Sequence, residues 1–557
     1  MILGIDVGGT HTDAVLIENL AVKRKTKVPT DEKNLLNSLL AVTTDLLKEE
    51  QPEKLERVVL STTISTNAIV QKKTDPVGMI LISGPGLPPS LLPVHQDSTH
   101  IRGYSNHRGV EMAAIDPDEV TRASKRFLEA GIKHIGVVGK FCTRNPKQEG
   151  AVRDLLDGAF EHISLGHRLS GHLNFPRRIA TTYLNESIWR RYNSFISQIQ
   201  GFVRDQGITV PIYILKADGG TFDIEHSREF PVQTILSGPA ASIMGILSMA
   251  RCRRDAVALD MGGTTTDIAL FADGVPLLEP FGVTIEGHKS LIRGLKTKSI
   301  GVGGDSRVVV TDKKLQIGPV REGPAYACGG PCPTPTDAMI VLGLTAIGDP
   351  SLARKAMEGV GRQLGIGSED AARAVHEETC RMVAAAVTSM IDEVNNKPVY
   401  TIHEMLEGKK LIPETLFVVG GPAGPIAPRL SELLGYPVQI PEHAEVANAI
   451  GAALARTTAE MTLLADTEQR ILTIAEEGYQ ESIPANFSKM DAIRIGKDRL
   501  REKVTAMGAR EEDLEIEVIE DMEFNMVKQF YTTGKNIRVK VQVKPGLIAG
   551  LAAGGKS

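Results

Sequence analysis

Two short segments of this chain carry the same arrangement of aspartate, glycine and threonine. The first is DVGGTHTDAVLI at residues 6–17, and the second is DMGGTTTDIALF at residues 260–271. In each segment one aspartate precedes a Gly-Gly pair, and a second aspartate follows seven residues after the first. Glycine lets the backbone approach an anion closely, and clustered backbone N–H groups bind phosphate. The repeated pattern predicts two phosphate-binding β-hairpins with carboxylates beside them.

The four aspartates of these segments are the candidates for catalysis. Asp6 and Asp260 each end a short apolar run, and a carboxylate at a strand end can hold Mg²⁺, usually through water. We expect Asp6 and Asp260 to hold Mg²⁺ or Mn²⁺, and Asp13 and Asp267 to orient the group that accepts a phosphoryl group. The residues expected to contact the phosphates are Gly8, Gly9, Thr10, His11, Thr12, Gly262, Gly263, Thr264 and Thr265.

Two further glycine-rich stretches complete the set of motifs. LFVVGGPAGPIAP at residues 416–428 is an apolar strand that runs into Gly420 and Gly421, which leaves room for a flat base or a sugar to stack on the backbone. Taken alone, an ordinary strand-to-helix turn is the more frequent meaning of such a pattern. LSGPAASIMG at residues 236–245 predicts a helix start dense in small residues, suited to close helix contact or to a hinge.

Composition and charge describe a multidomain globular chain. The 557 residues include 42% hydrophobic and 24% charged residues, with a formal net charge of −5. These values exclude wholesale disorder, and the absence of a Lys/Arg block argues against nucleic-acid binding. No apolar run reaches the length of a membrane span, and the N-terminus MILGIDVGGT does not resemble a signal peptide. Five cysteines, an odd number, argue against a disulfide framework. We expect a cytoplasmic protein that does not bind membranes.

The segments around the motifs alternate between strand and helix patterns. This alternation predicts an α/β fold in which helices cover the sheets. The expected strands are 57–61, 78–82, 134–138, 211–215 and 415–419, and the expected helices are 34–47, 117–130, 148–159, 178–200, 368–395 and 445–464, with Ser368 as an N-cap. We expect a first half at 1–250 with an inserted α/β segment at about 84–180, a second half at 251–465, and a small α+β appendix with a flexible tail at 466–557.

The order of these motifs resembles that of the acetate and sugar kinase, Hsp70 and actin superfamily. Its members place a first phosphate loop, a connecting helix, a second phosphate loop and an adenosine loop in this sequence. The resemblance implies two duplicated actin/Hsp70-like halves of the ribonuclease H type, with ATP in the cleft between them.

A narrower resemblance covers residues 1–460. The stretches that carry it are STTISTNAIVQKK at 61–73, RRIATTYLNESI at 177–188, LSGPAAS at 236–242, ALDMGGTTTDIAL at 258–270, SIGVGGDS at 299–306 and GGPCPTPTDA at 329–338. Together they resemble the hydantoinase/oxoprolinase family. That resemblance implies an ATP-dependent hydrolase, or the ATP-binding A subunit of one, which phosphorylates the carbonyl oxygen of a cyclic amide such as a hydantoin or 5-oxoproline.

The same resemblance implies further site residues and partners. Gly301, Gly303, Gly304, Gly420 and Gly421 would contact the nucleotide, and a second large subunit of the hydantoinase B type would complete the enzyme. One alternative is the ATP-handling subunit of a ketone carboxylase, as in the acetone carboxylase branch. Another is an Hsp70-like or reactivase ATPase that acts on a partner protein, because all three share the nucleotide pocket.

Several residues depart from the family pattern or invite other roles. His11 stands where the family carries a bulky apolar or aromatic residue, and Asp305 stands where it carries a third glycine. Cys328 and Cys332 have neither a second cysteine pair nor a nearby histidine, so we interpret them as structural rather than zinc ligands. Asp337 is expected to be a helix N-cap. The spacing of His162, His167 and His172 fits neither one helix face nor one strand face, so we assign them no metal.

Overall fold

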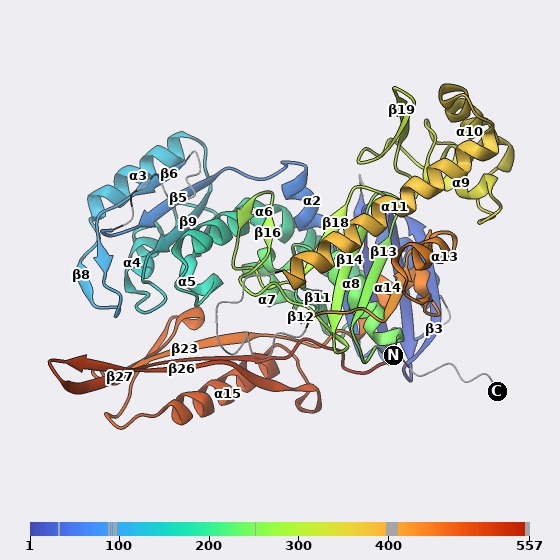
Figure 1. The fold of residues 1–557 in the computed structure, drawn as a ribbon. Coiled ribbons are helices and arrows are strands. Elements are labelled where there is room, and N and C mark those ends of the chain that lie inside the picture. Colours follow the sequence, from blue (N-terminus) through green and yellow to red (C-terminus); the bar gives the residue numbers. More distant parts are fainter. Residues whose placement is uncertain are drawn as a thin grey trace.

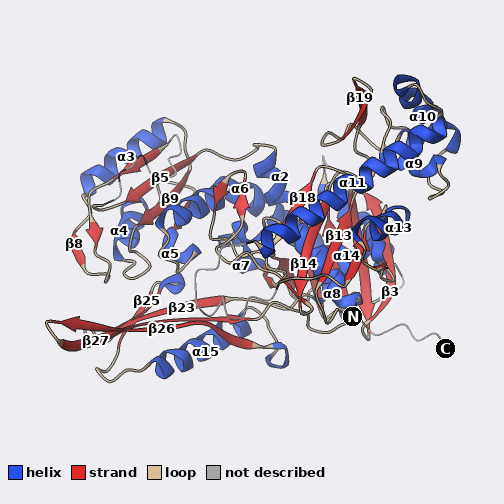
Figure 2. Ribbon diagram, in the orientation of Figure 1, coloured by secondary structure: helices blue, strands red, loops and turns tan. Residues whose placement is uncertain are grey.

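The computed structural model describes residues 1–551 except 32–33, 49, 87, 89, 91, 93–96, 251 and 397–409. Figures 1 and 2 show two sheets with their helices side by side, a smaller α/β body next to them, and a separate sheet beneath. No helix within these described ranges is long and apolar enough to cross a bilayer.

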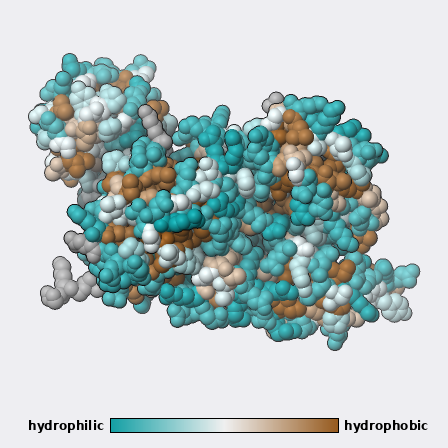
Figure 3. Space-filling model, turned by 180° about the vertical axis from the view of Figure 1, so that it is seen from behind, coloured by the Kyte–Doolittle hydropathy of each residue, from teal (hydrophilic) through white to brown (hydrophobic). Residues whose placement is uncertain are grey.

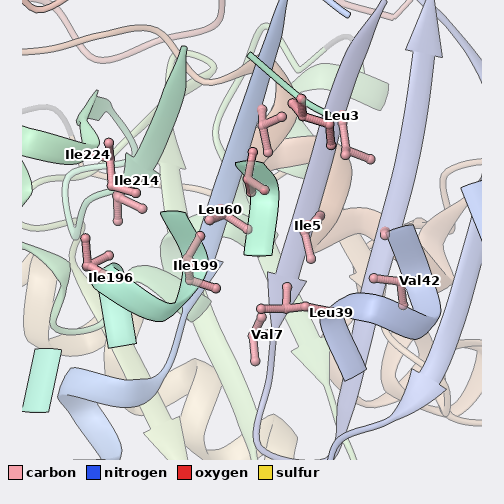
Figure 4. Close-up of a cluster of buried hydrophobic side chains, with 14 of the residues drawn as sticks. Leu3, Ile5, Val7, Leu39, Val42, Leu60, Ile196, Ile199, Ile214 and Ile224 are labelled. Carbon is pink, nitrogen blue, oxygen red and sulfur yellow. The ribbon is translucent and has the colours of Figure 1, made fainter. Parts of the chain in front are cut away.

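The first half is built on a six-stranded sheet. In sheet order its strands are β12 (Thr221–Asp223), β11 (Ile212–Leu215), β4 (Arg57–Thr62), β1 (Ile2–Val7), β2 (His11–Glu18) and β3 (Ala21–Pro29). Helices α1 (Leu35–Leu47) and α6 (Phe175–Asp205) pack on one face of this sheet. Figure 4 shows apolar side chains of the sheet, such as Ile5 and Leu60, meeting Leu39 of α1 and Ile199 of α6 in a closed core.

The second half repeats this plan. Its main sheet runs β15 (Val275–Pro276), β14 (Thr266–Ala272), β13 (Ala256–Met261), β21 (Thr415–Val419) and β22 (Val438–Gln439), and β18 (Thr297–Ile300) also pairs with β14. In both halves the central strand has an antiparallel hairpin partner on one side and a parallel strand on the other. The predicted duplication of α/β halves is therefore confirmed.

Two helices cross between the halves. These are α8 (Ser237–Met249) and α14 (Ala447–Leu454), and their backbones touch at glycines. A Cβ on Gly451 would lie 2.0 Å from the carbonyl oxygen of Ala241, and one on Gly245 would lie 2.1 Å from that of Ala447. Side chains other than hydrogen at these two positions would push the helices apart, so the small-residue pattern near residue 240 reflects close helix packing.

The helix expected at residues 445–464 is wrong beyond Leu454. Ala455 turns to an extended conformation, and the chain is then captured by β12 through backbone bonds from Thr221 N to Arg456 O and from Thr458 N to Thr221 O. Residues Glu460–Asp466 form strand β23 of the C-terminal sheet. The apolar run continues through both elements, so its length alone suggested one long helix.

The inserted body has a parallel sheet of its own. Its strands are β6 (Ser98–His100), β5 (Val77–Ile82), β9 (His134–Gly139) and β10 (His162–Leu165) in neighbouring order, with helices α3 (Pro117–Glu129) and α4 (Lys147–Leu156) against them. Since β5 pairs with β9, the insertion begins at Val77 rather than near residue 84. Short α2 (Ile64–Val70) precedes it, and α5 (Gly166–Leu169) leads to α6.

The C-terminal body starts earlier than expected. Its sheet runs β25 (Tyr479–Ser482), β24 (Ile471–Ile474), β23, β27 (Tyr531–Val543) and β26 (Ile516–Lys528), with α15 (Lys489–Ala506) on one face. Its first strand begins at Glu460, so the boundary at 466 cuts through the end of β23. The β26–β27 hairpin projects past α15 in Figure 1 and ends at Phe530, which is 98% exposed.

The end of the described chain is not a flexible tail. The amide of Ile548 donates to the carbonyl of Leu454 at 2.9 Å, and that of Leu551 donates to the carbonyl of Ser248 at 3.1 Å. Residues 547–551 therefore pack back onto the ends of α14 and α8. Residues 552–557, also expected to be flexible, lie outside the described part of the chain.

A satellite of the second half lies between β18 and β21. It contains β19 (Val308–Thr311), β20 (Lys314–Ile317), α9 (Pro335–Val341), α10 (Pro350–Leu364) and α11 (Ser368–Asn395). Two expected caps are wrong: Gly367 precedes α11, and Thr334 caps α9. Asp337 instead occupies the third helical position and completes a capping box with Thr334, which satisfies the same end of the helix.

The surface is largely hydrophilic on the face opposite to Figure 1. Figure 3 shows hydrophobic side chains on that face gathered in separate patches rather than in one continuous area. Scattered apolar groups of this kind are usual on soluble domains.

Substituting two helix glycines should separate close packing from helix propensity. Gly451→Ala should lower stability by about 1–3 kcal/mol, because its Cβ would overlap α8. Gly359→Ala, within α10, has no atom within 4 Å of the new Cβ and should raise stability by up to about 1 kcal/mol. Urea unfolding of both variants checks this, and equal effects would contradict the assigned α8–α14 contact.

Candidate active site

The two Gly-Gly hairpins face one cleft of about 1170 Å³ between the halves. The first hairpin joins β1 to β2 and the second joins β13 to β14. In the first, Asp6 pairs with Asp13 across the strands, and in the second Asp260 pairs with Asp267 in the same register. The predicted site residues that line the cleft are Asp6, Gly8, Gly9, Thr10, His11, Asp13, Asp260, Gly262, Gly263, Thr264, Thr265, Asp267, Gly420 and Gly421.

A short polar network connects the carboxylates of the two halves. Asn448 of α14 donates from Nδ2 to Asp6 Oδ2 at 3.1 Å, and its Oδ1 lies 2.9 Å from the Ser242 hydroxyl. Ser242, on α8, also hydrogen-bonds to Asp260. The two crossing helices thus hold one aspartate from each half at the bottom of the cleft. Neither Ser242 nor Asn448 was identified from the sequence, because neither belongs to a loop motif.

The carboxylates are held in a poorly solvated, mutually repelling group. Burial, together with a smaller effect of the Asp260 charge, raises the pKa of Asp6 to about 6. Burial raises the pKa of Asp13 and of Asp267 to about 7 each, and it also raises the pKa of Asp260. Asp6 Oδ1 and Asp13 Oδ1 are buried and accept no hydrogen bond from any described residue. The site therefore favours a cation or a proton.

Among the basic side chains that line the same cleft, two form ion pairs with aspartates near the hairpins. Lys27 Nζ of β3 lies 3.0 Å from Asp13 Oδ2, and Arg321 lies 3.3 Å from Asp305 Oδ2. Burial, together with the charges of Lys27 and Arg321, lowers the pKa of His11. Counting back from the turn between β2 and β3 would pair Asp13 with Thr26. A bulge between Leu16 and Ile17 shifts the register by one residue, so Asp13 pairs with Lys27 instead.

Four predicted contact residues lie behind the loops instead of lining the cleft. Thr12 is buried, and its hydroxyl lies 3.0 Å from that of Thr30. Gly301, Gly303 and Gly304 belong to the loop behind the second hairpin, where Gly304 N donates to Gly262 O at 2.9 Å. These four residues therefore contact the hairpin loops and their flanking strands and do not line the cleft.

Close approach explains two of the other glycines. A Cβ on Gly263 would lie 2.7 Å from Asp305 Oδ2, and one on Gly420 would lie 2.3 Å from Met261 O and 2.8 Å from Asp260 Oδ1. Gly420 also has a positive φ of 95°. Asp305, which departs from the family pattern, thus covers the second hairpin and pairs with Arg321.

The far wall of the cleft is also polar. It is formed by α2, α6 and the loop after α2, and its polar residues are Asn67, Gln71, Lys73, Arg190, Arg191, Ser194 and Gln198. Cys328, which is exposed, and Cys332, which is buried, lie elsewhere, as do His162, His167 and His172. The cleft therefore has one end lined by the two Gly-Gly hairpins and another lined by polar and basic side chains of α2 and α6.

Comparison with known proteins identifies the family. Residues 2–159 match the hydantoinase/oxoprolinase N-terminal region, and residues 178–461 match the hydantoinase/oxoprolinase domain. The chain belongs to the hydantoinase/oxoprolinase family. The resemblance inferred from the motifs is confirmed.

Relatives and solved structures agree with this membership. Caprolactamase subunit alpha of Pseudomonas jessenii is 26% identical over 488 residues, covering 78% of this chain and 67% of that protein. The crystal structure of ATP-dependent caprolactamase from Pseudomonas jessenii superposes with a TM-score of 0.72 at 20% identity, over 100% of this chain and 89% of that one. A chain of nucleotide-free acetone carboxylase superposes with a TM-score of 0.75 at 18% identity, over 98% of this chain and 88% of that one. These two likenesses establish a shared fold.

Removing one carboxylate should stabilise the protein in the absence of metal and nucleotide. The pKa of Asp267 rises from 3.8 to about 7 on folding. Between these values the folded protein keeps a proton that the unfolded chain releases, so stability falls as the pH rises through this window. Asp267→Asn should therefore be more stable than the native chain by about 1–3 kcal/mol at pH 8, with the gain shrinking toward pH 4.

Urea unfolding with a chelator at several pH values measures this difference. Asp312→Asn, in the exposed β19–β20 turn, is the matched control and should change little at any pH. A stability difference for Asp267→Asn that is the same at every pH would contradict the assigned burial of this carboxyl group.

Proposed function

We propose that this chain binds Mg·ATP in the cleft and transfers the γ-phosphoryl group to the carbonyl oxygen of a cyclic amide. The observation that carries the proposal is the mirrored pair of hairpins, each presenting two aspartates in the same register to one cleft. Two phosphate-binding loops that face each other suit a nucleoside triphosphate, because phosphoryl transfer depends mainly on positioning and charge neutralisation. Membership of the family supports the choice of a cyclic amide as acceptor.

The aspartates fit a magnesium ion. Asp6 and Asp260 would hold it, since Asp6 Oδ1 is a buried oxygen without a hydrogen-bond donor among the described residues. Within the described part of the chain, no three or more His, Cys, Asp or Glu side chains are arranged so that they could hold a metal on their own. Mg²⁺ matches this pattern, because it commonly takes one or two carboxylates together with water and phosphate oxygens, and Mn²⁺ also accepts oxygen ligands. When bound, the ion would neutralise charge on the phosphates.

The chain's own groups account for the remaining steps. Backbone N–H groups of the two hairpins would hold the phosphates, while Gly420 and Gly421 leave space for the nucleoside. Lys27 and Arg321 add positive charge beside the loops. Asp13, with a pKa of about 7, can accept or hold a proton near neutral pH and would orient the acceptor together with Asp267.

Phosphorylation makes the amide carbonyl reactive toward water. The lactam oxygen would attack the γ-phosphorus and ADP would leave, giving an O-phosphorylated imidate. Water would then add to the former carbonyl carbon, and cleavage of the C–N bond in this adduct would open the ring to an amino acyl phosphate. A second water would hydrolyse the acyl phosphate to the amino acid and phosphate. One ATP and two waters are consumed, and ADP, phosphate and the amino acid are released.

A second large subunit of the hydantoinase B type would complete this enzyme in the cytoplasm. The related caprolactamase chain is itself designated a subunit. Free cysteines at all five positions suit a reducing compartment.

The second candidate is the ATP-handling subunit of a ketone carboxylase, which the fold shared with acetone carboxylase favours. An enolate would then replace the imidate. An ATPase acting on a partner protein shares the same pocket and would need no small acceptor.

Substitution of Asp260 tests the proposed site. Asp260→Asn keeps the side-chain volume but removes a charge that would face the metal, so ATP turnover should fall at least about 100-fold while the fold is retained. The assay measures phosphate release with lactams, hydantoins, 5-oxoproline and ketones plus bicarbonate, with and without the protein encoded beside this chain. Asp312→Asn is again the control.

The pattern of stimulation distinguishes the candidates. Stimulation by a cyclic amide supports the hydrolase, stimulation by a ketone with bicarbonate supports the carboxylase, and stimulation by a protein alone supports the partner-acting ATPase. Unchanged turnover in a folded Asp260→Asn protein would contradict the proposed site.

A further inference from the structure

A second cavity of about 730 Å³ lies away from the cleft, where the ATPase halves meet the C-terminal body. Its walls come from the turn after β11, helix α7 (Ile224–Glu229), the loop at 291–293, the start of β23, the turn after β24 and α15. Figure 1 shows α7 and β12 above the C-terminal sheet and α15. None of the candidate active-site residues lines it.

Most of the charges in these walls already have partners. Arg168 pairs with Glu229 at 2.8 Å, and Lys503 lies 3.8 Å from Glu477. Glu460 pairs with Lys540 at 2.8 Å. Lys216 is buried, donates to Thr458 O at 2.8 Å, and lies 3.5 Å from Asp218. These pairs explain why a cavity lined by so many ionisable groups is compatible with a stable fold.

Two partly buried side chains of opposite charge are left incompletely satisfied, whereas Glu502, which also lacks an ion pair within the described part of the chain, is exposed. Arg293 Nη2 is buried and has no hydrogen-bond acceptor among the described residues, and the other end of its guanidinium only approaches Asp218 at 3.5 Å. Glu476 accepts backbone N–H bonds from Gly171 at 3.1 Å and Thr462 at 3.3 Å, but no cation pairs with it within the described ranges. Burial, with a smaller effect of the Glu460 charge, raises the pKa of Glu476, and the charge of Lys503 offsets this only in part.

We propose that this cavity binds a small amino acid, whose carboxylate accepts hydrogen bonds from Arg293 and whose ammonium group donates to Glu476. Lys216 adds positive charge to the Arg293 side of the cavity. The apolar side chains of Leu169, Phe230, Val232 and Met507 also line it and would contact the methylene groups of the ligand. A ligand with only one charged end would leave either Arg293 or Glu476 uncompensated, so the two residues together select a zwitterion.

The chemistry of this ligand matches a reaction product. Ring opening of a lactam gives one molecule with a carboxylate and an amine, so the cavity would be a product or effector site separate from the cleft. This link to the reaction rests on the proposed function. The binding itself does not, because Arg293 and Glu476 lie outside the cleft and need neither ATP nor a partner subunit.

Calorimetric titration of the full chain tests the inference directly. The probes are 4-aminobutanoate, 5-aminopentanoate and 6-aminohexanoate, compared with hexanoate and hexylamine. At least one amino acid should bind, and each singly charged compound should bind at least about tenfold more weakly. Arg293→Gln and Glu476→Gln should each weaken amino-acid binding at least about tenfold. Arg254→Gln, at an exposed ion pair with Glu414, should leave it unchanged.

Each other outcome overturns the proposal in a defined way. Equal binding of hexanoate would indicate a simple anion site, and binding unaffected by Arg293→Gln and Glu476→Gln would place the ligand elsewhere. No binding of any amino acid up to about 10 mM, while Mg·ATP still raises the melting temperature, would overturn the cavity assignment and leave the proposed function standing. If Arg293→Gln fails to fold, Arg293→Lys keeps the charge but removes the fork of donors, and it should still weaken binding.

Discussion

The burial of four aspartates, to which repulsion between their charges adds a smaller effect, is the constraint on which the structure of the cleft depends. Each hairpin brings two carboxylates together across paired strands, and hydrogen bonds through Ser242 and Asn448 link Asp260 of one pair to Asp6 of the other. Burial raises the pKa of Asp6, Asp13 and Asp267 to between about 6 and about 7, so the folded chain resists full ionisation of this group. Such an arrangement is costly without a cation, and under the proposed function it would favour a cation-bound polyphosphate.

The two crossing helices keep the carboxylates in place. Gly245 and Gly451 let α8 and α14 touch, and Ser242 and Asn448 on the same helices connect Asp260 to Asp6. Residues 547–551 then bind the ends of both helices, so the C-terminal body is tied to the pair that joins the halves. A ligand in the second cavity would therefore contact a body that is attached directly to the elements holding the active site.

The sequence predicts the motifs and the duplicated fold well, because both depend on local patterns. The strand at 415–419 and the helix at 368–395 match the structure to the residue, since apolar periodicity and turn residues bound them clearly. Features that depend on strand register or on contacts distant in sequence could not be predicted. A bulge in the β2–β3 hairpin places Lys27 opposite Asp13. Backbone bonds to β12 end the expected helix at Leu454, and the chain continues as β23. The family resemblance predicts nucleotide contact for Gly301, Gly303 and Gly304. In the structure these glycines pack against the second Gly-Gly hairpin and do not line the cleft.

Under the proposed function the four-aspartate cleft binds a magnesium–nucleotide complex. Calorimetric titration with a non-hydrolysable ATP analogue near pH 7 tests this binding, in buffers of different ionisation enthalpy, with Mg²⁺ or with a chelator. Partly protonated carboxylates must release protons when a cation occupies the site. We expect binding that requires Mg²⁺ and is accompanied by net proton release, which Asp6→Asn should diminish. Equally tight binding in the chelator, or Mg²⁺-dependent binding without proton release, would contradict the proposed metal–nucleotide site.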